Sequence, residues 1–302
     1  MRSLRIIAGT ALLALAAAGC GGGSTDNPLD SGASSSGGGE TVTVGSAAFP
    51  ESVLLAEIYA GALEAADVKV ERKLSIGERE VYYKLLEKGD INVLPEYNGA
   101  LLAYLDPEAA LPATTEETNA AITAKLPGSL KILTSAAAED NDSLTVTADT
   151  ATKNNLKTIA DLAPVAKDFT VGGPAPFEKR YKDKLNEAYG LTFKEWKPDR
   201  SGGGNIPTWL KNGDVQVGNV FTTTPAIVLD KLVVLEDPKG VFGRQNVTPL
   251  VSADGVPAAG QQALDAVSAK LTTQGLLDMM NKVATDKTDP AVVAKEWLTA
   301  NL

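Results

Sequence analysis

Four aromatic residues stand at related positions in this chain and are the side chains best suited to form a ligand-binding wall. Phe49 and Phe177 follow glycine-containing runs, and Tyr97 and Phe221 each stand seven positions after an aspartate. Large aromatic rings dominate hydrophobic cores as well as binding sites. The four residues are therefore candidate contacts for a ligand, and the alternative for each is a place in the core.

The segments that carry these aromatics occur twice in the same order. Residues 42–49 (VTVGSAAF) are echoed by residues 169–177 (FTVGGPAPF), and residues 88–93 (KGDINV) by residues 212–217 (NGDVQV). A shared order of this kind indicates two lobes of similar build. Ligands of open parallel sheets bind outside the carboxyl ends of the strands, where Tyr97 and Phe221 are expected. The two aromatics should therefore line one cleft between the lobes.

Polar side chains beside the aromatics are the remaining candidate contacts. Arg180 follows the second glycine-containing run near a predicted helix start, and its planar guanidinium suits a ligand carboxylate. The alternative for Arg180 is an exposed charged turn. Asn98 and the hydroxyls of Thr222 and Thr223 directly follow Tyr97 and Phe221, so we expect them to contact the ligand.

Composition excludes much of catalysis. The 302 residues include no histidine and one cysteine, which excludes intrachain disulfides, catalytic pairs with histidine, and the usual zinc sites. We expect no enzyme, no metal and no cofactor, and a hydrolase with paired carboxylates is the disfavoured alternative. Residues 139–143 (EDNDS) lack the glycine and final glutamate of an EF-hand loop, so we interpret them as a polar crossover.

The net charge of -10, from 28 basic and 38 acidic residues, provides no basic surface for nucleic acid. The amino terminus carries Arg2 and Arg5, an apolar run over residues 6–18, and the lone cysteine Cys20. This order predicts a secretory signal over residues 1–19, too short to span a membrane. It resembles the lipobox of bacterial lipoproteins, which implies lipidation of Cys20. Residues 20–40, rich in glycine and serine, are then a flexible tether.

The elements that position the candidate residues alternate between strand and helix, which predicts an α/β fold. We predict strands over residues 42–44 and 91–94. The run Phe49-Pro50-Glu51 predicts a helix start with an acid in its first turn. A helix over residues 78–88 should end at Gly89, and residues 261–302 should form helices that pack on a lobe.

Five short segments together resemble the ProX/OpuC-type solute-binding proteins, particularly their actinobacterial branch. That family serves ABC importers for glycine betaine, choline, carnitine and related osmoprotectants. The segments are residues 45–51 (GSAAFPE), 77–82 (GEREVY), 89–91 (GDI), 95–99 (PEYNG) and 221–223 (FTT). The resemblance covers essentially all of residues 41–302. It implies a lipid-anchored, monomeric receptor on the outer face of the cytoplasmic membrane, which delivers its ligand to a permease with its ATPase.

The resemblance also implies a two-lobed periplasmic-binding-protein fold of the venus-flytrap type, class II. Lobe 1 would comprise residues 41–143 plus 249–302 and lobe 2 residues 146–246, with crossover hinges near residues 144–147 and 247–250. Family members hold a quaternary ammonium in a box of tyrosines. Tyr97 and Phe221 fall on box positions, and Arg180 falls on the arginine that binds the carboxylate of betaine.

The box is incomplete, because no tyrosine occurs near Ser143 or near Gln245 and Asn246. A methylated cation donates no hydrogen bonds and binds where aromatic faces present negative potential in a dry pocket. The incomplete box therefore leaves two alternatives open. One is the same receptor with a different cargo, such as an aromatic, phenolic or other polar small molecule. The other is an envelope sensor without a transport role.

Overall fold

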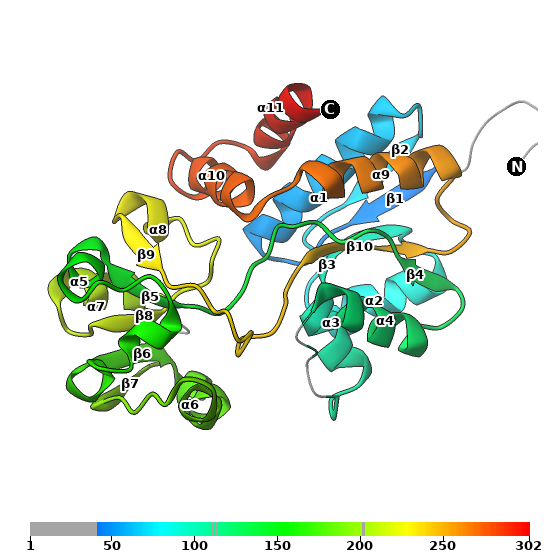
Figure 1. Ribbon diagram of the computed structural model, residues 1–302. Helices are drawn as coiled ribbons and strands as arrows, with labels where there is room; N and C mark the ends of the chain where they lie inside the picture. The colour runs from blue at the N-terminus through cyan, green and yellow to red at the C-terminus, as the bar shows by residue number, and fades with distance from the viewer. Residues whose placement is uncertain (1–40, 110–111, 113, 201–202) are drawn as a thin grey trace, which may run out of the picture. The chain divides into compact units, whose positions relative to one another are not determined.

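The computed structural model describes residues 41–302 except residues 110–111, 113 and 201–202 (Figure 1). The predicted signal peptide, the tether and Cys20 lie outside the described residues. The described chain forms two mixed five-stranded sheets. The first contains β1 (Val42–Gly45), β2 (Val70–Lys73), β3 (Val93–Tyr97), β4 (Leu130–Ile132) and β10 (Val247–Ser252). The second contains β5 (Leu144–Thr147), β6 (Thr170–Pro174), β7 (Glu195–Asp199), β8 (Val217–Asn219) and β9 (Leu232–Val234).

The two sheets have the same topology. Their strand orders are β2-β1-β3-β10-β4 and β7-β6-β8-β5-β9. In the first, β1 runs parallel to β2 and β3, and β10 runs antiparallel to β3. In the second, β6 runs parallel to β7 and β8, and β5 runs antiparallel to β8. This correspondence confirms the repeat predicted from the sequence and the two-lobed α/β fold.

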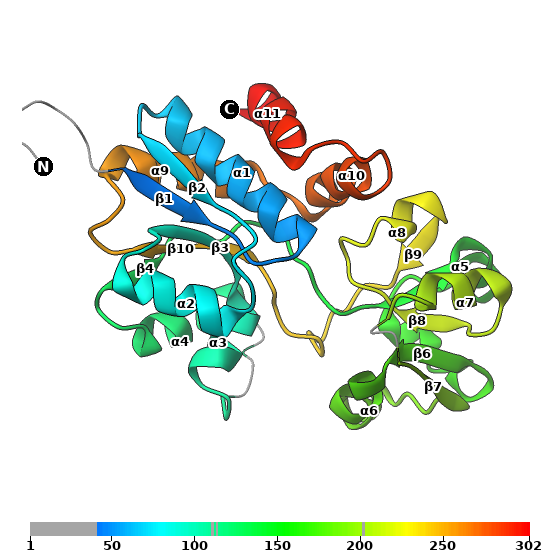
Figure 2. The ribbon, with the colours of Figure 1, turned by 180° about the vertical axis from the view of Figure 1, so that it is seen from behind.

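Helices cover both faces of the first sheet, as Figures 1 and 2 show. On one face lie α1 (Pro50–Ala65), α9 (Ala258–Lys270), α10 (Thr273–Ala284) and α11 (Pro290–Asn301), and on the other α2 (Arg79–Lys88), α3 (Asn98–Leu105) and α4 (Thr115–Lys125). Successive strand residues alternate between the faces. Val93 packs in the core under α1, and Leu94 packs in the core beside α2. The predicted helical tail is thus confirmed as three helices on the first lobe.

The second sheet is covered in the same manner. The larger core joins its strands to α5 (Ala148–Asn154), α6 (Ala175–Tyr189) and the 3₁₀ turns Ile159–Leu162 and Ala166–Asp168. On the opposite face of this sheet, a smaller core packs α7 (Ile206–Asn212) against the strands. Helix α8 (Ala226–Leu229) lies at the edge of this smaller core. Each lobe therefore has its own hydrophobic core. Within the part of the chain that the structure describes, none of the helices combines the length and the apolar composition that a membrane span needs.

Two segments connect the lobes. The chain leaves the first sheet after β4 and enters the second at β5, and it returns between β9 and β10. The predicted crossing places are wrong, because residues 144–147 and 247–250 are strands of the sheets. Their apolar and β-branched residues fit a sheet, whereas the polar residues 139–143 before β5 lie outside both sheets. The interpretation of residues 139–143 as a crossover is confirmed.

Helix α2 ends as its sequence predicts, with Gly89 in the left-handed conformation at φ 79°. A Cβ added to Gly89 would meet nothing within 4 Å, so only backbone strain opposes a side chain there. We expect Gly89→Ala to lower the free energy of unfolding by about 1 kcal/mol, measured by urea titration. Gly128→Ala is the matched control, since Gly128 has equal space and an ordinary φ. An equal loss of unfolding free energy in both variants would contradict an effect of backbone strain at Gly89.

Candidate functional site

Phe49 and Tyr97 meet at the carboxyl ends of β1 and β3. Phe49 is the N-cap of α1 and Tyr97 is the last residue of β3, and their ring centroids lie 6.3 Å apart. Phe49 is 44% exposed, whereas Tyr97 is 9% exposed. Phe49 also lines a pocket of about 300 Å³ together with Ala48, Gly77 and Arg79. An exposed aromatic face backed by a second ring is therefore available at the strand ends where ligands of such sheets bind.

A buried carboxylate lies behind this aromatic pair. Glu51 stands in the first turn of α1 and is only 5% exposed. The Tyr97 hydroxyl donates a hydrogen bond to its Oε1 atom. The Ala47 amide in the same loop donates to Ser52 Oγ at 2.9 Å, which fixes the entry into α1. The loop thus holds Phe49 outward and Glu51 inward.

A second carboxylate, Asp140, reaches the same place from the crossover. Thr223, which follows β8, donates to Asp140 Oδ1 through its hydroxyl at 2.7 Å and through its amide at 3.4 Å. The Thr223 side chain also lies against the Glu51 carboxyl. Residues of the first lobe, the crossover and the second lobe therefore meet in one cluster, formed by Glu51, Tyr97, Asp140 and Thr223.

The two carboxyl groups of this cluster hold protons more tightly than ordinary acids. Burial, reinforced by the charge of Asp140, raises the pKa of Glu51 to about 7. Burial also raises the pKa of Asp140 to about 6, although the hydrogen bonds from Thr223 oppose the increase. Burial and the nearby acids raise the pKa of the Tyr97 hydroxyl, which stays protonated. Because the charge of Asp140 acts on Glu51, the titration of one acid depends on the charge of the other.

An ion pair supports the wall of the Phe49 pocket. Arg79 donates from Nε and Nη2 to the two carboxylate oxygens of Glu96, both at 2.9 Å. Glu96 is 1% exposed and also accepts from the Tyr82 hydroxyl at 2.9 Å and the Tyr97 amide at 3.1 Å. With its charge paired in this way, Arg79 shapes the pocket without adding a free positive charge.

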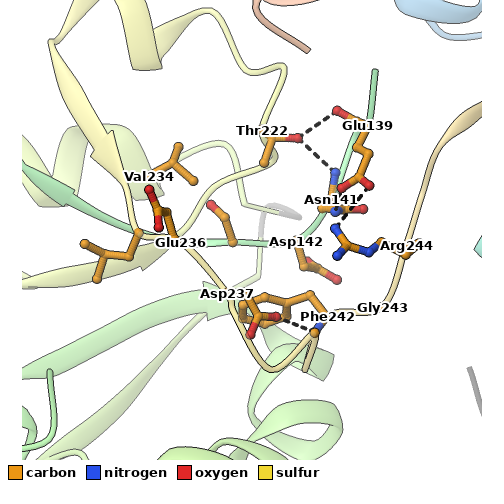
Figure 3. A pocket seen from close by; sticks show the side chains of 13 residues that line it. Glu139, Asn141, Asp142, Thr222, Val234, Glu236, Asp237, Phe242, Gly243 and Arg244 are labelled. Atoms are coloured by element: carbon orange, nitrogen blue, oxygen red, sulfur yellow. Dashed lines mark hydrogen bonds and ion pairs between the residues drawn. The ribbon is translucent and has the colours of Figure 1, made fainter. Parts of the chain in front are cut away.

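A further pocket of about 180 Å³ lies where the two crossover segments run side by side (Figure 3). Arg244 of the returning segment pairs with Glu139 of the outgoing one at 3.3 Å. The Thr222 hydroxyl donates to the Glu139 carbonyl at 3.0 Å and accepts from the Asn141 amide at 2.9 Å. Thr222 therefore ties the second lobe to the crossover and has no proton left for a ligand. Thr222 also lines this pocket, so its predicted contact with a ligand stays a prediction.

The second lobe contributes two of the predicted residues near its strand ends. Phe221 is 43% exposed, nearly the same as Phe49. The Arg180 guanidinium lies 3.9 Å from Asp142 Oδ2 and 5.3 Å from the centre of the Tyr181 ring. Asp142 also accepts from the Tyr181 hydroxyl at 2.8 Å and from Asn219 at 3.0 Å. Arg180 is thus half-exposed with its charge opposed by Asp142.

Two predicted contacts are corrected by burial. Phe177 is fully buried and packs against Tyr181, Trp196 and Phe242 in the core of the second lobe. The helix in this lobe starts at Ala175 directly after β6, so Phe177 falls on the inner face of α6. In the first lobe, four residues separate β1 from α1, and Phe49 stays in the loop.

Asn98 is also fully buried, and its side chain is occupied by the protein. Its Oδ1 accepts from the Asn246 and Gly99 amides, both at 2.8 Å, and its Nδ2 donates to Asn119 at 3.1 Å. The Asn98 side chain therefore fixes the returning crossover against α3 instead of facing a ligand.

Sequence reasoning missed the two carboxylates at the centre of the cluster. Glu51 reads as an acid that suits the first turn of a helix, and Asp140 reads as one of several acids in a polar connection. A usable signal for Glu51 is its place two residues after Phe49, in the helix turn that directly follows the loop after β1. Asp140 has no such signal, because only the fold brings Thr223, which follows β8, next to it.

Comparisons with known proteins agree with this architecture. Residues 40–300 match the family described as "Substrate binding domain of ABC-type glycine betaine transport system". The carnitine transport binding protein OpuCC of Listeria monocytogenes is 24% identical over 276 residues, 87% of each chain. The glycine betaine-binding protein YehZ of Escherichia coli strain K12 is 26% identical over 273 residues, 85% of this chain and 89% of that protein.

A solved structure titled as a glycine betaine/carnitine/choline ABC transporter has the same fold. It superimposes with a TM-score of 0.78 at 22% identity, covering 86% of this chain and 98% of that one. The family match spans nearly the whole described chain, including both lobes and both crossovers. The chain therefore belongs to the family of substrate-binding domains of ABC-type glycine betaine transport systems.

Proposed function

We propose that this protein captures a small methylammonium solute, of the glycine betaine, carnitine or choline type, and delivers it to an ABC permease. The observation that carries the proposal is the exposed Phe49 ring, which lies at a tilt beside the Tyr97 ring, whose hydroxyl contacts the buried Glu51 carboxyl. A quaternary ammonium is attracted to aromatic faces and to negative charge in a site that excludes water. The similar proteins named for carnitine and glycine betaine support this ligand class.

In this proposal Phe49 and Phe221 are the aromatic walls contributed by the two lobes, and Tyr97 supports the first. Thr223 positions Asp140, and Arg180 is available to the carboxylate of a zwitterionic ligand. A ligand that contacts both lobes favours their closed arrangement, because only differential affinity for that arrangement can drive closure. The crossovers at residues 139–143 and 236–246 then serve as hinges.

The proposed anchoring follows from the amino terminus. Cys20 carries the lipid after removal of residues 1–19, and residues 20–40 tether a monomeric receptor to the outer face of the cytoplasmic membrane. Two or more acyl chains on such a cysteine hold a protein firmly, whereas one gives only marginal binding. Labelling with radioactive palmitate, compared with Cys20→Ser, tests this proposal, and equal labelling of both would contradict it.

The transport role is tested by calorimetric titration of residues 41–302 with glycine betaine, carnitine and choline. We expect saturable binding of at least one of them, with a raised melting temperature. A ligand at a hundredfold its dissociation constant adds about 2.7 kcal/mol to the free energy of unfolding. Binding of none of the three, with a shift from an aromatic or phenolic compound, would reassign the cargo.

The aromatic walls give a specific prediction. Phe49→Ala and Phe221→Ala should each weaken binding of the best ligand about two- to thirtyfold, since one cation–π contact contributes roughly 0.5–2 kcal/mol. Both rings are nearly half-exposed, so the melting temperature of the free protein should change little. Val292→Ala on α11, 49% exposed, is the matched control and should leave affinity unchanged. Unchanged affinity in both phenylalanine variants would place the site elsewhere.

A further inference from the structure

We infer that the two lobes rotate about two single residues, Gly243 on the returning crossover and Asp140 on the outgoing one. Gly243 is a positioning residue in this inference, because its left-handed backbone sets how one lobe is held against the other. The inference deepens the proposed function and rests on it in one respect, that the rotation closes the lobes around a ligand. It follows from which lobe holds each of the neighbouring crossover residues.

The second lobe holds the returning crossover as far as Gly243. Phe242 is 4% exposed and belongs to the larger core of that lobe. The Phe242 amide donates to Asp237 Oδ2 at 3.0 Å, and the Gly243 amide donates to the Gly240 carbonyl at 3.0 Å. The chain up to the Gly243 amide therefore moves with the second lobe.

The first lobe holds the returning crossover from the next residue onward. The Gln245 side chain accepts a hydrogen bond from the Ala100 amide at 2.9 Å, in the first turn of α3. A Cβ added to Gly99 would collide with the Arg244 carbonyl, so the crossover lies directly against the start of α3. The chain from the Arg244 carbonyl therefore moves with the first lobe.

Gly243 lies between these two parts of the chain, with Phe242 on one side and Arg244 on the other (Figure 3). Its φ is 75°, in the left-handed region that strains a residue with a Cβ. Glycine adopts positive and negative φ about equally well. Rotation about the backbone bonds of Gly243 can therefore change the arrangement of the lobes while the hydrogen bonds on either side stay intact.

The outgoing crossover passes from one lobe to the other at Asp140. The Asp140 amide donates to the Gln245 carbonyl at 3.2 Å, on the part held by the first lobe. The Asn141 amide donates to Thr222 Oγ1 at 2.9 Å, and the Thr222 amide donates to the Asn141 carbonyl at 3.1 Å. Thr222 follows β8 of the second sheet, so Asn141 moves with the second lobe.

Two side-chain hydrogen bonds span this outgoing pivot. The Thr222 hydroxyl donates to the Glu139 carbonyl at 3.0 Å, and the Thr223 hydroxyl donates to Asp140 Oδ1 at 2.7 Å. A rotation at Asp140 changes the geometry of both bonds. The two threonines therefore stabilise the described arrangement, and a ligand must favour the rotated one by more to close the lobes.

Gly243→Ala and Gly240→Ala form a matched pair of variants. Both glycines have a positive φ, 75° and 63°, but Gly240 lies inside the part that the second lobe holds. A Cβ disfavours such a conformation about five- to thirtyfold. At Gly243 a rotation of the lobes relieves this strain, so we expect the arrangement to change. At Gly240 the strain stays, so we expect a lower melting temperature and an unchanged arrangement.

Spin labels on the two lobes measure the arrangement without any ligand. The labels are attached to Ala120→Cys on α4 and Glu187→Cys on α6, two exposed positions, in the full chain with its one native cysteine removed by Cys20→Ser. Pulsed electron-spin resonance then gives the distribution of distances between the labels. We expect Gly243→Ala to shift the most populated distance and Gly240→Ala to leave it unchanged. The melting temperature should fall more in Gly240→Ala.

An unchanged distance distribution in Gly243→Ala, or an equal shift in both variants, would overturn the pivot. Titration with glycine betaine, choline and carnitine then tests its part in closure. Because apparent affinity depends on the fraction of protein in the binding-competent arrangement, the dissociation constant of Gly243→Ala should differ from the wild type by up to about thirtyfold. Gly240→Ala should match the wild type.

The outcomes separate this inference from the proposed function. A shifted distance in Gly243→Ala with a wild-type dissociation constant would overturn the role of the pivot in closure and leave the receptor role intact. Failure of all three compounds to bind the wild type would overturn the proposed function. The pivot itself would stand or fall on the ligand-free distances.

Discussion

Replacing Glu96 with glutamine should lower the free energy of unfolding by about 3 kcal/mol and the melting temperature by roughly 6–12 °C. Glu96 is 1% exposed and accepts four hydrogen bonds, two of them from Arg79. An amide has one acceptor oxygen and would direct its own N–H groups at the remaining donors. Removing one member of a buried ion pair also leaves the other charge without its partner.

Calorimetry of the ligand-free protein measures this effect. Glu80→Gln is the control, since Glu80 is a neighbouring acid on the exposed side of α2. The double variant Arg79→Met with Glu96→Gln should recover part of the lost stability, because neither charge is then left alone. A Glu96→Gln melting temperature within 2 °C of the wild type would show that the ion pair contributes little.

The stability of the ligand-free protein should fall as the pH rises from about 4.5 to about 7, through the contribution of Glu51. Its pKa is raised from 4.5 to about 7 in the folded protein, so the folded state binds the proton more tightly than the unfolded state. The contribution is complete below pH 4.5, where both states are protonated, and is lost above pH 7. For a group only 5% exposed it amounts to about 3 kcal/mol.

Glu51→Gln isolates this contribution. The variant should match the wild type near pH 4.5 and exceed its free energy of unfolding by about 3 kcal/mol at pH 8, measured by urea titration. Glu187→Gln should follow the wild type at both pH values. A wild-type advantage at pH 8 would mean that Glu51 is stabilised as a carboxylate in the folded protein, contrary to its surroundings.

Much of the fold could be predicted from the sequence because local residue patterns determine it. Pro50 and Gly89 mark a helix start and a helix end, and both lie where the structure has them. The repeated segments predicted two lobes, and the two sheets share one topology. Each of these features depends on the residues of one short stretch, which a single sequence displays.

The site was less predictable because it depends on spacing in three dimensions. Phe49 and Phe177 occupy equivalent places in the repeat, but a shorter loop moves Phe177 onto the inner face of α6. Asn98 and Thr222 follow the right aromatics, yet the backbone of the crossovers already uses their side chains. Whether a polar residue faces a ligand depends on what the rest of the chain leaves unpaired, which no local pattern records.

The antiparallel strand in each sheet has a consequence for biosynthesis. In the first sheet, β10 lies between β3 and β4 and joins them, but it consists of residues Val247–Ser252. The second sheet needs only a continuous stretch that ends with β9 at Val234. A chain emerging from its amino terminus thus completes the second sheet before the first. The first sheet therefore stays as two separate groups of strands until β10, which is synthesised near the end of the chain, joins them.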